Sequence, residues 1–314
     1  MASRSERILI TGGMGFTGRP LAQRLRGDGH DVLALGHADK AETPSFDLRD
    51  FDSIIRMLTQ FRPDVIVHLA GIAATQHNKL DEMYSANVIG TANLFAALRS
   101  LRTAPRLVVI ASSAQVYASV GTDLPLREDS PLAPKTHYGI SKRASEEIAS
   151  IYSDDFPITI CRPFNYTGPE QTTDFLVPKI VQHYVQRRQE IKLANLDLFR
   201  DLSDVDRVVE AYARLVSRSL SSNVVNICSG RSIYLADVIT IMDDVSGYKM
   251  KVVSDPALFR KNEPRMFVGS SSRLEALVGP LPNPEFRETL VRMYEQGRKE
   301  CSGSAHGNVT LSGT

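Results

Sequence analysis

Short runs of consecutive apolar residues alternate with amphipathic stretches along the first half of the chain. Continuous apolar runs are typical of strands that are buried on both faces, whereas apolar positions three and four residues apart predict helices. The predicted strands are Arg7–Thr11, Asp31–Leu35, Asp64–Leu69, Arg106–Ala111 and Ile158–Arg162, and the predicted helices lie near Gly15–Gly27, Asp50–Phe61, Asp81–Leu101 and Thr136–Ser153. This alternation predicts an α/β fold with a doubly wound parallel Rossmann sheet, whose ligand crevice lies at the carboxyl ends of the strands.

The alternation weakens after Arg162, where several prolines and glycines interrupt it. A helix near Phe175–Gln189 is followed by a helix over Asp204–Ser219 and a strand over Val224–Cys228. We therefore expect residues 1–162 and about 204–228 to form one domain, interleaved with a smaller domain of residues 163–203 and 229–301. Residues 302–314 are rich in Ser and Gly, which predicts a disordered tail.

The composition narrows the function classes. The chain of 314 residues carries 37 Lys and Arg against 36 Asp and Glu, so a net charge of +1 gives no general attraction to nucleic acid or to an acidic membrane. No apolar run approaches the roughly 20 residues that span a bilayer. The three cysteines (Cys161, Cys228 and Cys301) lack metal-ligand spacing, which favours reduced thiols in a cytoplasmic protein without a metal site.

A glycine turn follows the first predicted strand. Gly12, Gly15 and Gly18 are spaced G-x-x-G-x-x-G between that strand and the first helix. Such a turn lets the backbone approach a pyrophosphate at the positive end of the helix. The spacing differs from the commonest G-x-G-x-x-G fingerprint, but its place at the first strand of an alternating chain predicts a dinucleotide site.

The second strand bears on which dinucleotide binds. A carboxylate at its end would hydrogen-bond the ribose of NAD, but this strand ends at Leu35, Gly36 and His37. His37, Lys40 and Arg19 are instead candidates to face the 2′-phosphate of NADP, which we slightly favour over NAD, although solvated loop cations would look the same. Asp47, on a short predicted third strand over residues 45–48, is a candidate to bind the adenine or to cap a helix.

Tyr138 and Lys142 lie four residues apart in a predicted helix, so their side chains share a face. An ammonium within about 4–6 Å lowers the pKa of a phenol, which is otherwise about 10. We therefore expect Tyr138 to act as a general acid or base. The spacing alone also occurs by chance on solvated helices, so this role needs support from the rest of the chain.

That support comes from motifs that occur in one order: the glycine turn, Asp47, residues 68–71 (His-Leu-Ala-Gly), Asn87, residues 112–117 (Ser-Ser-Ala-Gln-Val-Tyr) and Tyr138-x-x-x-Lys142. Together they resemble the extended short-chain dehydrogenase/reductase superfamily of NAD-dependent epimerases and dehydratases. The resemblance implies that Tyr138 is the general acid, that Lys142 binds the nicotinamide ribose, and that Ser113, or alternatively Ser112, polarises the reacting C–O bond. Asn87 is then structural support. The implied cofactor contacts are Gly12, Gly15, Phe16, Thr17, Gly18, His37, Asp47, Leu48, Leu69, Ala70, Gly71, Tyr138, Lys142 and Pro163.

Within the superfamily, residues 162–169 and 195–205 most resemble GDP-4-keto-6-deoxy-D-mannose reductases. This resemblance implies a nucleotide-sugar substrate, GDP-linked, and a homodimer joined through the helices near Asp81–Leu101 and Thr136–Ser153. The implied substrate contacts are Thr75, Ser113, Gln115, Asn165, Val177, Lys179, Arg200, Arg260 and Glu263. Arg200 has the alternative of a surface ion-pair cluster with Asp201 and Asp204, and residues 260–263 lack the proline that the superfamily carries there.

Gln115 limits the reaction. Dehydratases of the superfamily carry acidic residues just after the catalytic hydroxyl, and an amide cannot accept a proton at neutral pH. Ala114 and Gln115 therefore favour hydride transfer to a C4 ketone over dehydration. A nucleotide-sugar 4-epimerase with retained NAD is the alternative enzyme, and a non-enzymatic dinucleotide-sensing protein is the alternative of another class.

Overall fold

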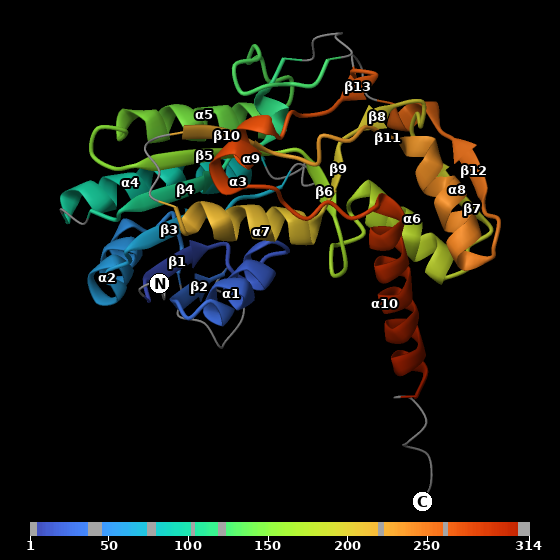
Figure 1. Ribbon diagram of the computed structural model, residues 1–314, viewed down its shortest axis with the longest axis horizontal. Helices are drawn as coiled ribbons and strands as arrows, with labels where there is room; N and C mark the ends of the chain where they lie inside the picture. Colours follow the sequence, from blue (N-terminus) through green and yellow to red (C-terminus); the bar gives the residue numbers. More distant parts are fainter. Residues whose placement is uncertain are drawn as a thin grey trace, which may run out of the picture.

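The computed structural model describes residues 5–36, 46–73, 80–101, 104–118, 124–218, 223–259 and 263–306, with side chains described as far as residue 302. Two parts lie side by side, a layered α/β part and a smaller part that carries the C-terminal helix (Figure 1). Of the residues considered above, His37, Lys40, Thr75, Arg260 and residues 307–314 lie outside the described residues.

The larger part is built on a six-stranded sheet whose strand order is β10-β5-β4-β3-β1-β2, with every neighbouring pair parallel. The predicted α/β fold is therefore confirmed, and each expected strand of this sheet is present. Its strands are β1 (Arg7–Thr11), β2 (Asp31–Leu35), β3 (Val65–His68), β4 (Leu107–Ala111), β5 (Ile158–Pro163) and β10 (Asn223–Ile227).

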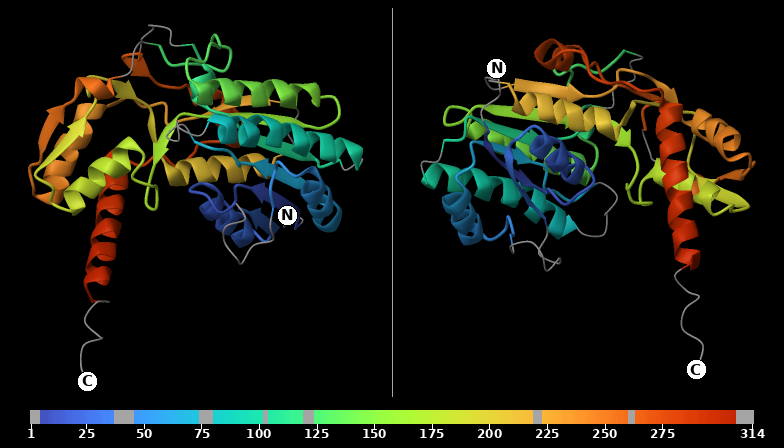
Figure 2. Two further views of the ribbon diagram at one scale, coloured as in Figure 1. Left: turned by 180° about the vertical axis from the view of Figure 1, so that it is seen from behind. Right: turned by 60° about the horizontal axis from the view of Figure 1, so that its bottom comes forward.

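Alternate residues of each strand enter two separate cores, which explains why the strands read as continuous apolar runs. Ile8 and Ile10 of β1 pack with α1 and α7, whereas Leu9 packs with α2, α4 and α5. Helices thus cover both faces of the sheet (Figures 1 and 2). These helices are α1 (Gly18–Gly27), α2 (Phe51–Phe61), α3 (Leu80–Tyr84), α4 (Gly90–Ser100), α5 (His137–Ile151) and α7 (Val205–Val216), with the π-helical turn η1 (Ser85–Ile89) between α3 and α4.

The short third strand predicted over residues 45–48 is wrong for the described residues Phe46–Leu48. They form a turn in which the carbonyl of Asp47 accepts a hydrogen bond from the amide of Asp50. Asp50, rather than Asp47, caps α2, because its side chain accepts from the amides of Asp52 and Ser53. The apolar residues Phe46 and Leu48 are buried in the core without belonging to a sheet.

The smaller part has its own core and lies beyond the carboxyl ends of the sheet strands. Its helices are α6 (Leu176–Val185), α8 (Leu235–Ser246) and α10 (Phe286–His306). Its short strands are β7 (Glu190–Leu193) with β12 (Lys251–Ser254), and β8 (Phe199–Arg200) between β11 (Ile233–Tyr234) and β13 (Met266–Phe267). The pair β6 (Asn165–Thr167) and β9 (Leu202–Asp204) joins the two parts, and single turns η2 (Ala114–Val116) and η3 (Pro256–Leu258) complete the elements.

Two segments differ from the expected domain limits. Helix α9 (Ser272–Val278) contributes Leu274 and Val278 to the core of the larger part, although it falls within residues 229–301. Helix α10 continues through His306, past residue 302 where the tail was expected, and extends away from the rest of the protein (Figures 1 and 2).

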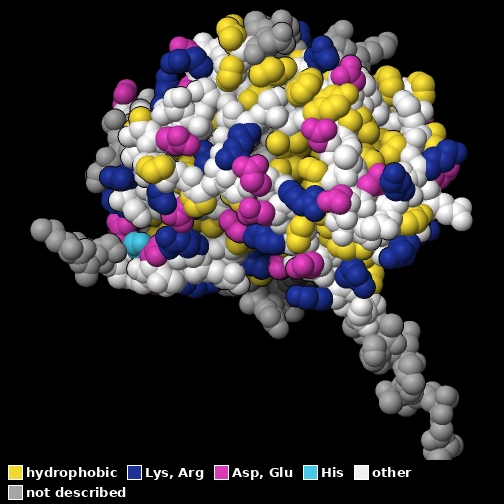
Figure 3. Space-filling view, turned by 45° about the vertical axis from the view of Figure 1, so that its right-hand side comes forward, with side chains coloured by type: hydrophobic (Ala, Val, Ile, Leu, Met, Phe, Trp, Pro, Cys, Tyr) yellow, Lys and Arg dark blue, Asp and Glu magenta, His cyan; other side chains and the backbone are white. Residues whose placement is uncertain are grey.

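Charged side chains of both signs are mixed on the surface of the protein. On the face in Figure 3, side chains of Lys and Arg are interspersed with those of Asp and Glu, as a net charge of +1 suggests. Within the described ranges, no helix has both the length and the apolar character that a membrane crossing requires.

Candidate active site

The glycine turn lies at the carboxyl end of β1. This strand lies between β2 and β3 in the sheet, so the turn is at the topological switch point, where strand order reverses. Gly12 has a φ of 70°, and a Cβ atom there would lie 2.7 Å from the amide nitrogen of Ala70. A Cβ atom on Gly18 would lie 2.3 Å from the carbonyl oxygen of Gly12. Only glycine fits both positions, so the turn presents bare backbone at the start of α1, as pyrophosphate binding requires.

A cleft of about 1030 Å³ runs from this turn to the smaller part. It brings together most of the expected site residues, from the glycine turn to the substrate end. The expected residues that line it are Gly12, Gly15, Phe16, Thr17, Gly18, Asp47, Leu48, Leu69, Ala70, Gly71, Ser113, Gln115, Tyr138, Lys142, Pro163, Asn165, Val177, Arg200 and Glu263. Lys179 is described but is absent from this lining.

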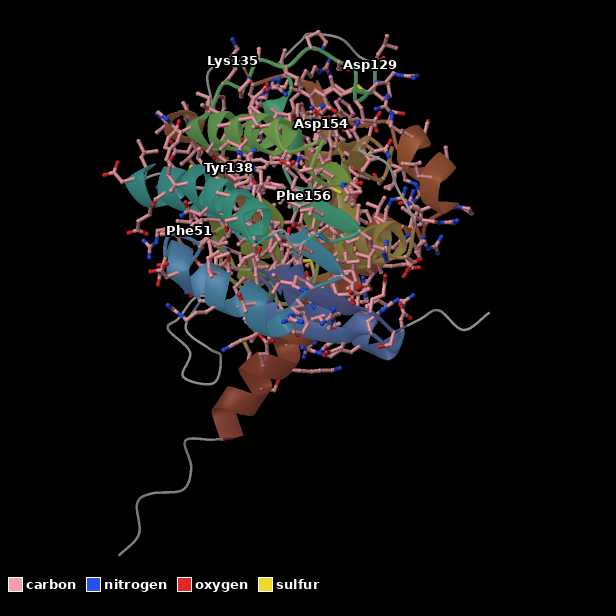
Figure 4. The ribbon with its side chains drawn as sticks, turned by 90° about the vertical axis from the view of Figure 1, so that its left-hand side faces the viewer. Phe51, Asp129, Lys135, Tyr138, Asp154 and Phe156 are labelled. Atoms are coloured by element: carbon pink, nitrogen blue, oxygen red, sulfur yellow. The ribbon has the colours of Figure 1, made fainter. Side chains whose placement is uncertain are left out.

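Tyr138 and Lys142 are placed by the start of α5. Thr136 caps this helix through a hydrogen bond from the amide of Gly139, so Tyr138 falls in the first turn (labelled in Figure 4). Lys142 Nζ lies 5.9 Å from the centroid of the Tyr138 ring and donates to the carbonyl oxygen of Ala111, 2.8 Å away, at the end of β4. Both side chains face the cleft from one side of the helix.

The pKa of Tyr138 moves in the direction opposite to the one expected from Lys142. Burial raises the pKa of Tyr138 well above its usual value, the nearby Tyr166 adds to this, and the neighbouring Ser113 hydroxyl lowers it in part. Burial also lowers the pKa of Lys142 to about 8, against the influence of Glu146, which raises it. The phenol therefore holds its proton, which suits a group that donates a proton to a developing alkoxide.

Ser112 and Ser113 have separate environments. The Ser112 hydroxyl donates to the carboxylate of Glu146 beneath the cleft, so its hydrogen is already engaged. Ser113 lines the cleft beside Tyr138, and its Oγ accepts a hydrogen bond of 3.1 Å from the amide of Gln115. Ser113 faces the cleft next to Tyr138, whereas the Ser112 hydroxyl is bonded to Glu146, so the geometry favours Ser113 over Ser112 as the polarising group.

Asn87 supports the site from the π-helical turn η1. Its amide is buried and bonds both backbone groups of Ile72, with the Ile72 amide donating across 2.8 Å and the Ile72 carbonyl oxygen accepting across 3.2 Å. Its Nδ2 also donates to Ser141 of α5 across 3.0 Å. Asn87 thus ties the loop after β3 to the helix that carries Tyr138, as expected of structural support.

Gln115 lies beside Ser113 in the wall of the cleft and is held by Thr136, whose hydroxyl donates to Gln115 Oε1 across 3.0 Å. Residues 112–118 contain no carboxylate. This wall of the cleft therefore supplies hydroxyl and amide groups, and no second acid or base, next to Tyr138.

At the substrate end, Arg200 is not part of a surface cluster with Asp201 and Asp204. Its side chain is buried and donates to Glu263 across 2.9 Å, and also to the carbonyl oxygens of Phe199, Pro264 and Arg265. Two residues expected to bind the substrate separately therefore form an ion pair in the wall of the cleft.

At the dinucleotide end, Asp47 is paired with Arg49, whose Nη2 lies 2.6 Å from Asp47 Oδ2. Arg49 lines the cleft and was not identified from the sequence, although its place two residues after Asp47 was a signal for it. Arg19 is absent from the cleft lining; it donates to the Met14 carbonyl and lies 3.5 Å from Glu170. Phe267 and Leu198, from the smaller part, are further lining residues that the sequence did not suggest.

Solved structures share this arrangement. A putative epimerase from Burkholderia cenocepacia J2315 superimposes with a TM-score of 0.87 at 37% identity, over 95% of this chain and all of that one (100%). The structure of RMD from Pseudomonas aeruginosa complexed with NADPH superimposes with a TM-score of 0.84 at 25% identity, over 94% of this chain and 100% of that one.

Sequence relatives agree with them. The GDP-6-deoxy-D-talose 4-dehydrogenase of Aggregatibacter actinomycetemcomitans is 32% identical over 94% of this chain and 99% of its own length. The GDP-6-deoxy-D-mannose reductase of Pseudomonas aeruginosa is 29% identical over 91% of this chain and 95% of its own. The model of the NAD dependent epimerase/dehydratase family matches residues 8–228. The expected resemblance is thus confirmed, and the chain belongs to the NAD dependent epimerase/dehydratase family.

Proposed function

We propose that the protein reduces the C4 ketone of a nucleotide-linked 4-keto-6-deoxyhexose, with GDP as the nucleotide and NADPH or NADH as the reductant. The observation that carries this proposal is that Ser113, Tyr138 and Lys142 face one cleft with the glycine turn, next to Gln115 rather than a carboxylate. Two relatives that align over nearly the whole chain act, by their names, on GDP-linked deoxyhexoses.

The described residues fit a dinucleotide. The glycine turn leaves no room for a Cβ atom at Gly12 or Gly18, so its backbone can lie against a pyrophosphate. Lys142 would hold the nicotinamide ribose, and Pro163 would bound the nicotinamide. When bound, the reduced dinucleotide supplies the hydride that C4 receives.

The side chains of this protein handle the proton. As C4 gains the hydride, the C=O π bond breaks and its electron pair moves onto O4. The Tyr138 hydroxyl gives its proton to O4, and the Ser113 hydroxyl donates a hydrogen bond that stabilises the developing negative charge. The Lys142 ammonium stabilises the phenolate that remains, which regains a proton from water before the next turnover.

The substrate end follows the lining of the cleft. Asn165 and Gln115 would contact the sugar, and Val177 would lie near the nucleotide. Arg200 would bind the diphosphate, with Glu263 near the ribose hydroxyls. Gln115 favours this reduction over dehydration, because residues 112–118 carry no carboxylate that could take a second proton.

The competing enzyme function is a nucleotide-sugar 4-epimerase, which would use the same groups with a retained NAD. A dinucleotide-sensing protein without catalysis is the other competitor, and the Ser113, Tyr138 and Lys142 set speaks against it. The first assay tests the reductase. Protein is mixed with NADPH or NADH and GDP-4-keto-6-deoxymannose, and the absorbance of the reduced nicotinamide is followed.

Loss of absorbance in proportion to the sugar alcohol formed is the expected result. No loss with this or any other nucleotide keto-sugar would rule out the reductase. Interconversion of nucleotide sugars without added cofactor, with stoichiometric NAD released on denaturation, would support the epimerase. Unchanged activity and phenotype after Tyr138→Phe would support the sensing protein.

A homodimer and a cytoplasmic location belong to the same proposal. Ile89 of η1 and Ile140 of α5 are 52% and 44% exposed, and apolar side chains on the helices near Asp81–Leu101 and Thr136–Ser153 suit an intermolecular helix bundle. All three cysteines are free, which is typical of a reducing compartment. Light scattering tests this proposal by measuring the molar mass of the protein and of an Ile89→Glu variant. We expect the wild type to be a dimer and the variant to be a monomer.

A further inference from the structure

Glu146 is a buried carboxylate that the proposed reaction does not use. It lies on α5, four residues beyond Lys142 and eight beyond Tyr138, so the three side chains share one face of the helix. Only 1% of its side chain is exposed. An uncompensated charge at such a depth is costly, so its partners indicate what it does.

The carboxylate accepts hydrogen bonds from three side chains. Arg162 Nε donates to Oε1 and Arg162 Nη2 donates to Oε2, each across 2.8 Å, which is a two-point ion pair. Arg143 donates to Oε2 across 3.1 Å. The Ser112 hydroxyl donates to Oε1, and Ser112 is the residue before Ser113.

The far side of this network is also fixed. Arg162 Nη1 donates to the Tyr117 hydroxyl and to the carbonyl of Glu128, each across 3.1 Å. The Tyr117 hydroxyl donates in turn to Asn226 of β10 across 2.6 Å. Glu146 therefore connects helix α5 to three neighbouring strands. Ser112 directly follows β4, Arg162 belongs to β5, and Arg162 reaches Asn226 of β10 through Tyr117.

We propose that Glu146 is a positioning residue of the reaction: it fixes Ser112, and through it the Ser113 hydroxyl, relative to Tyr138, and its charge keeps Lys142 in the ammonium form. This proposal rests on the proposed function in its catalytic part. Its electrostatic part concerns dinucleotide binding and stands separately.

The surroundings of Lys142 support the electrostatic part. His68 from β3 is neutral, the Tyr138 phenol on the same helix holds its proton, and Arg162 from β5 is paired with Glu146. Arg143, on α5, also pairs with Glu146. Burial lowers the pKa of Lys142 to about 8, and Glu146 is the carboxylate that raises it. Without this charge, Lys142 would lose its proton at a lower pH.

The test uses the full-length protein in four forms besides the wild type. Glu146→Gln removes the charge and keeps the shape. Ser112→Ala removes only the link to β4, and a double variant combines the two. Glu147→Gln is the matched control, because the neighbouring Glu147 has the same charge but is 58% exposed. The readouts are the Kd of NADPH against pH, from nucleotide fluorescence, and kcat with a nucleotide keto-sugar.

In Glu146→Gln, the pH at which NADPH affinity is half lost should fall by about one unit, whereas Glu147→Gln should leave it unchanged. Ser112→Ala should lower kcat by about three- to tenfold without changing the Kd, and the double variant should lose no more kcat than Glu146→Gln, since both break one network.

An unchanged pH midpoint in folded Glu146→Gln, or kcat losses that multiply in the double variant, would overturn the proposal. If Glu146→Gln does not fold, an unchanged kcat in Ser112→Ala overturns it. If the wild type reduces no keto-sugar, the proposed function fails, while the pH dependence of NADPH binding still decides the role of Glu146.

Discussion

Arg200 Nη2 and Glu263 Oε1 lie 2.9 Å apart in the wall of the cleft, although 63 positions separate them in the sequence. The same guanidinium also donates to three backbone carbonyls, two of which belong to Pro264 and Arg265. Arg200 thus holds the segment after residue 262 against β8. A substrate diphosphate that binds Arg200 would compete with Glu263 for it.

Arg200→Lys should weaken nucleotide-sugar binding without affecting the dinucleotide. An ammonium has three donors and cannot reproduce the planar set of contacts that the guanidinium makes. We expect KM for the nucleotide sugar to rise by about tenfold, since the lost contacts involve a charged group, with an unchanged Kd for NADPH. Arg265→Lys is the control, because Arg265 is 70% exposed and its pair with Asp197 should contribute little. Equal KM values for the two variants would argue against the role of Arg200.

The glycine turn gives a sharper pair of variants. Gly18→Ala places a Cβ atom 2.3 Å from the Gly12 carbonyl oxygen, so the turn must shift and NADPH binding should weaken by at least about tenfold. Gly27→Ala, at the other end of α1, meets nothing within 4 Å and should stabilise the helix by about 0.5–1 kcal/mol with unchanged binding. Calorimetric titration of both variants measures this, and wild-type affinity in Gly18→Ala would contradict the assignment.

His68 should be neutral, with its proton on Nε2. Thr91 Oγ1 donates to the Asn87 carbonyl, so it accepts from His68 Nε2, and His68 Nδ1 then accepts from Thr11 Oγ1 across 2.6 Å. Burial, with a contribution from Lys142, lowers the pKa of His68 from 6.5 to about 3. Nitrogen-15 NMR should show this tautomer at pH 5, and an imidazolium signal would contradict it.

The same pKa makes stability depend on pH. Below pH 6.5 the unfolded chain takes up a proton that native His68 does not, so the free energy of unfolding falls as pH drops from about 6.5 toward 3. One such group contributes a slope of up to about 1.4 kcal/mol per pH unit. His68→Gln should reduce the slope in denaturant titrations by that amount.

The buried pair of Arg162 in β5 and Glu146 in α5 should contribute strongly to the stability of the protein. Arg162→Met leaves the Glu146 carboxylate without its main partner and should lower the free energy of unfolding by about 3–5 kcal/mol. Adding Glu146→Gln removes that stranded charge and should restore part of the loss. Urea denaturation of the single and double variants measures both values. A loss below about 1 kcal/mol in Arg162→Met would mean that the pair contributes little.

The central strands could be predicted because each is buried on both faces, which leaves a continuous apolar run such as Ile8, Leu9 and Ile10 of β1. The run through Phe46 and Leu48 misled for the same reason, since burial alone does not require a strand. Most of the residues expected at the site also line the cleft, and they could be named from local motifs. The pKa of Tyr138 could not, because it is set by burial in the assembled cleft.

Ion pairs and hydrogen bonds between residues far apart in the sequence could not be predicted either. Arg200 could be named as a candidate cation for the substrate, but its ion pair with Glu263 depends on how β8 and β13 come together. The Glu146 network likewise joins residues of α5, β4 and β5, and no local pattern marks it.

The most direct test of the proposed reaction is the oxidation of NADPH or NADH by GDP-4-keto-6-deoxymannose, compared between the wild type, Tyr138→Phe and Tyr152→Phe. Tyr152 stacks on Phe95 beyond the C-terminal end of α5 and serves as the control. We expect turnover in the wild type and Tyr152→Phe, and a kcat lower by about 10²- to 10⁴-fold in Tyr138→Phe with an unchanged Kd for NADPH. Turnover by Tyr138→Phe at the wild-type rate, or no oxidation by the wild type, would contradict it.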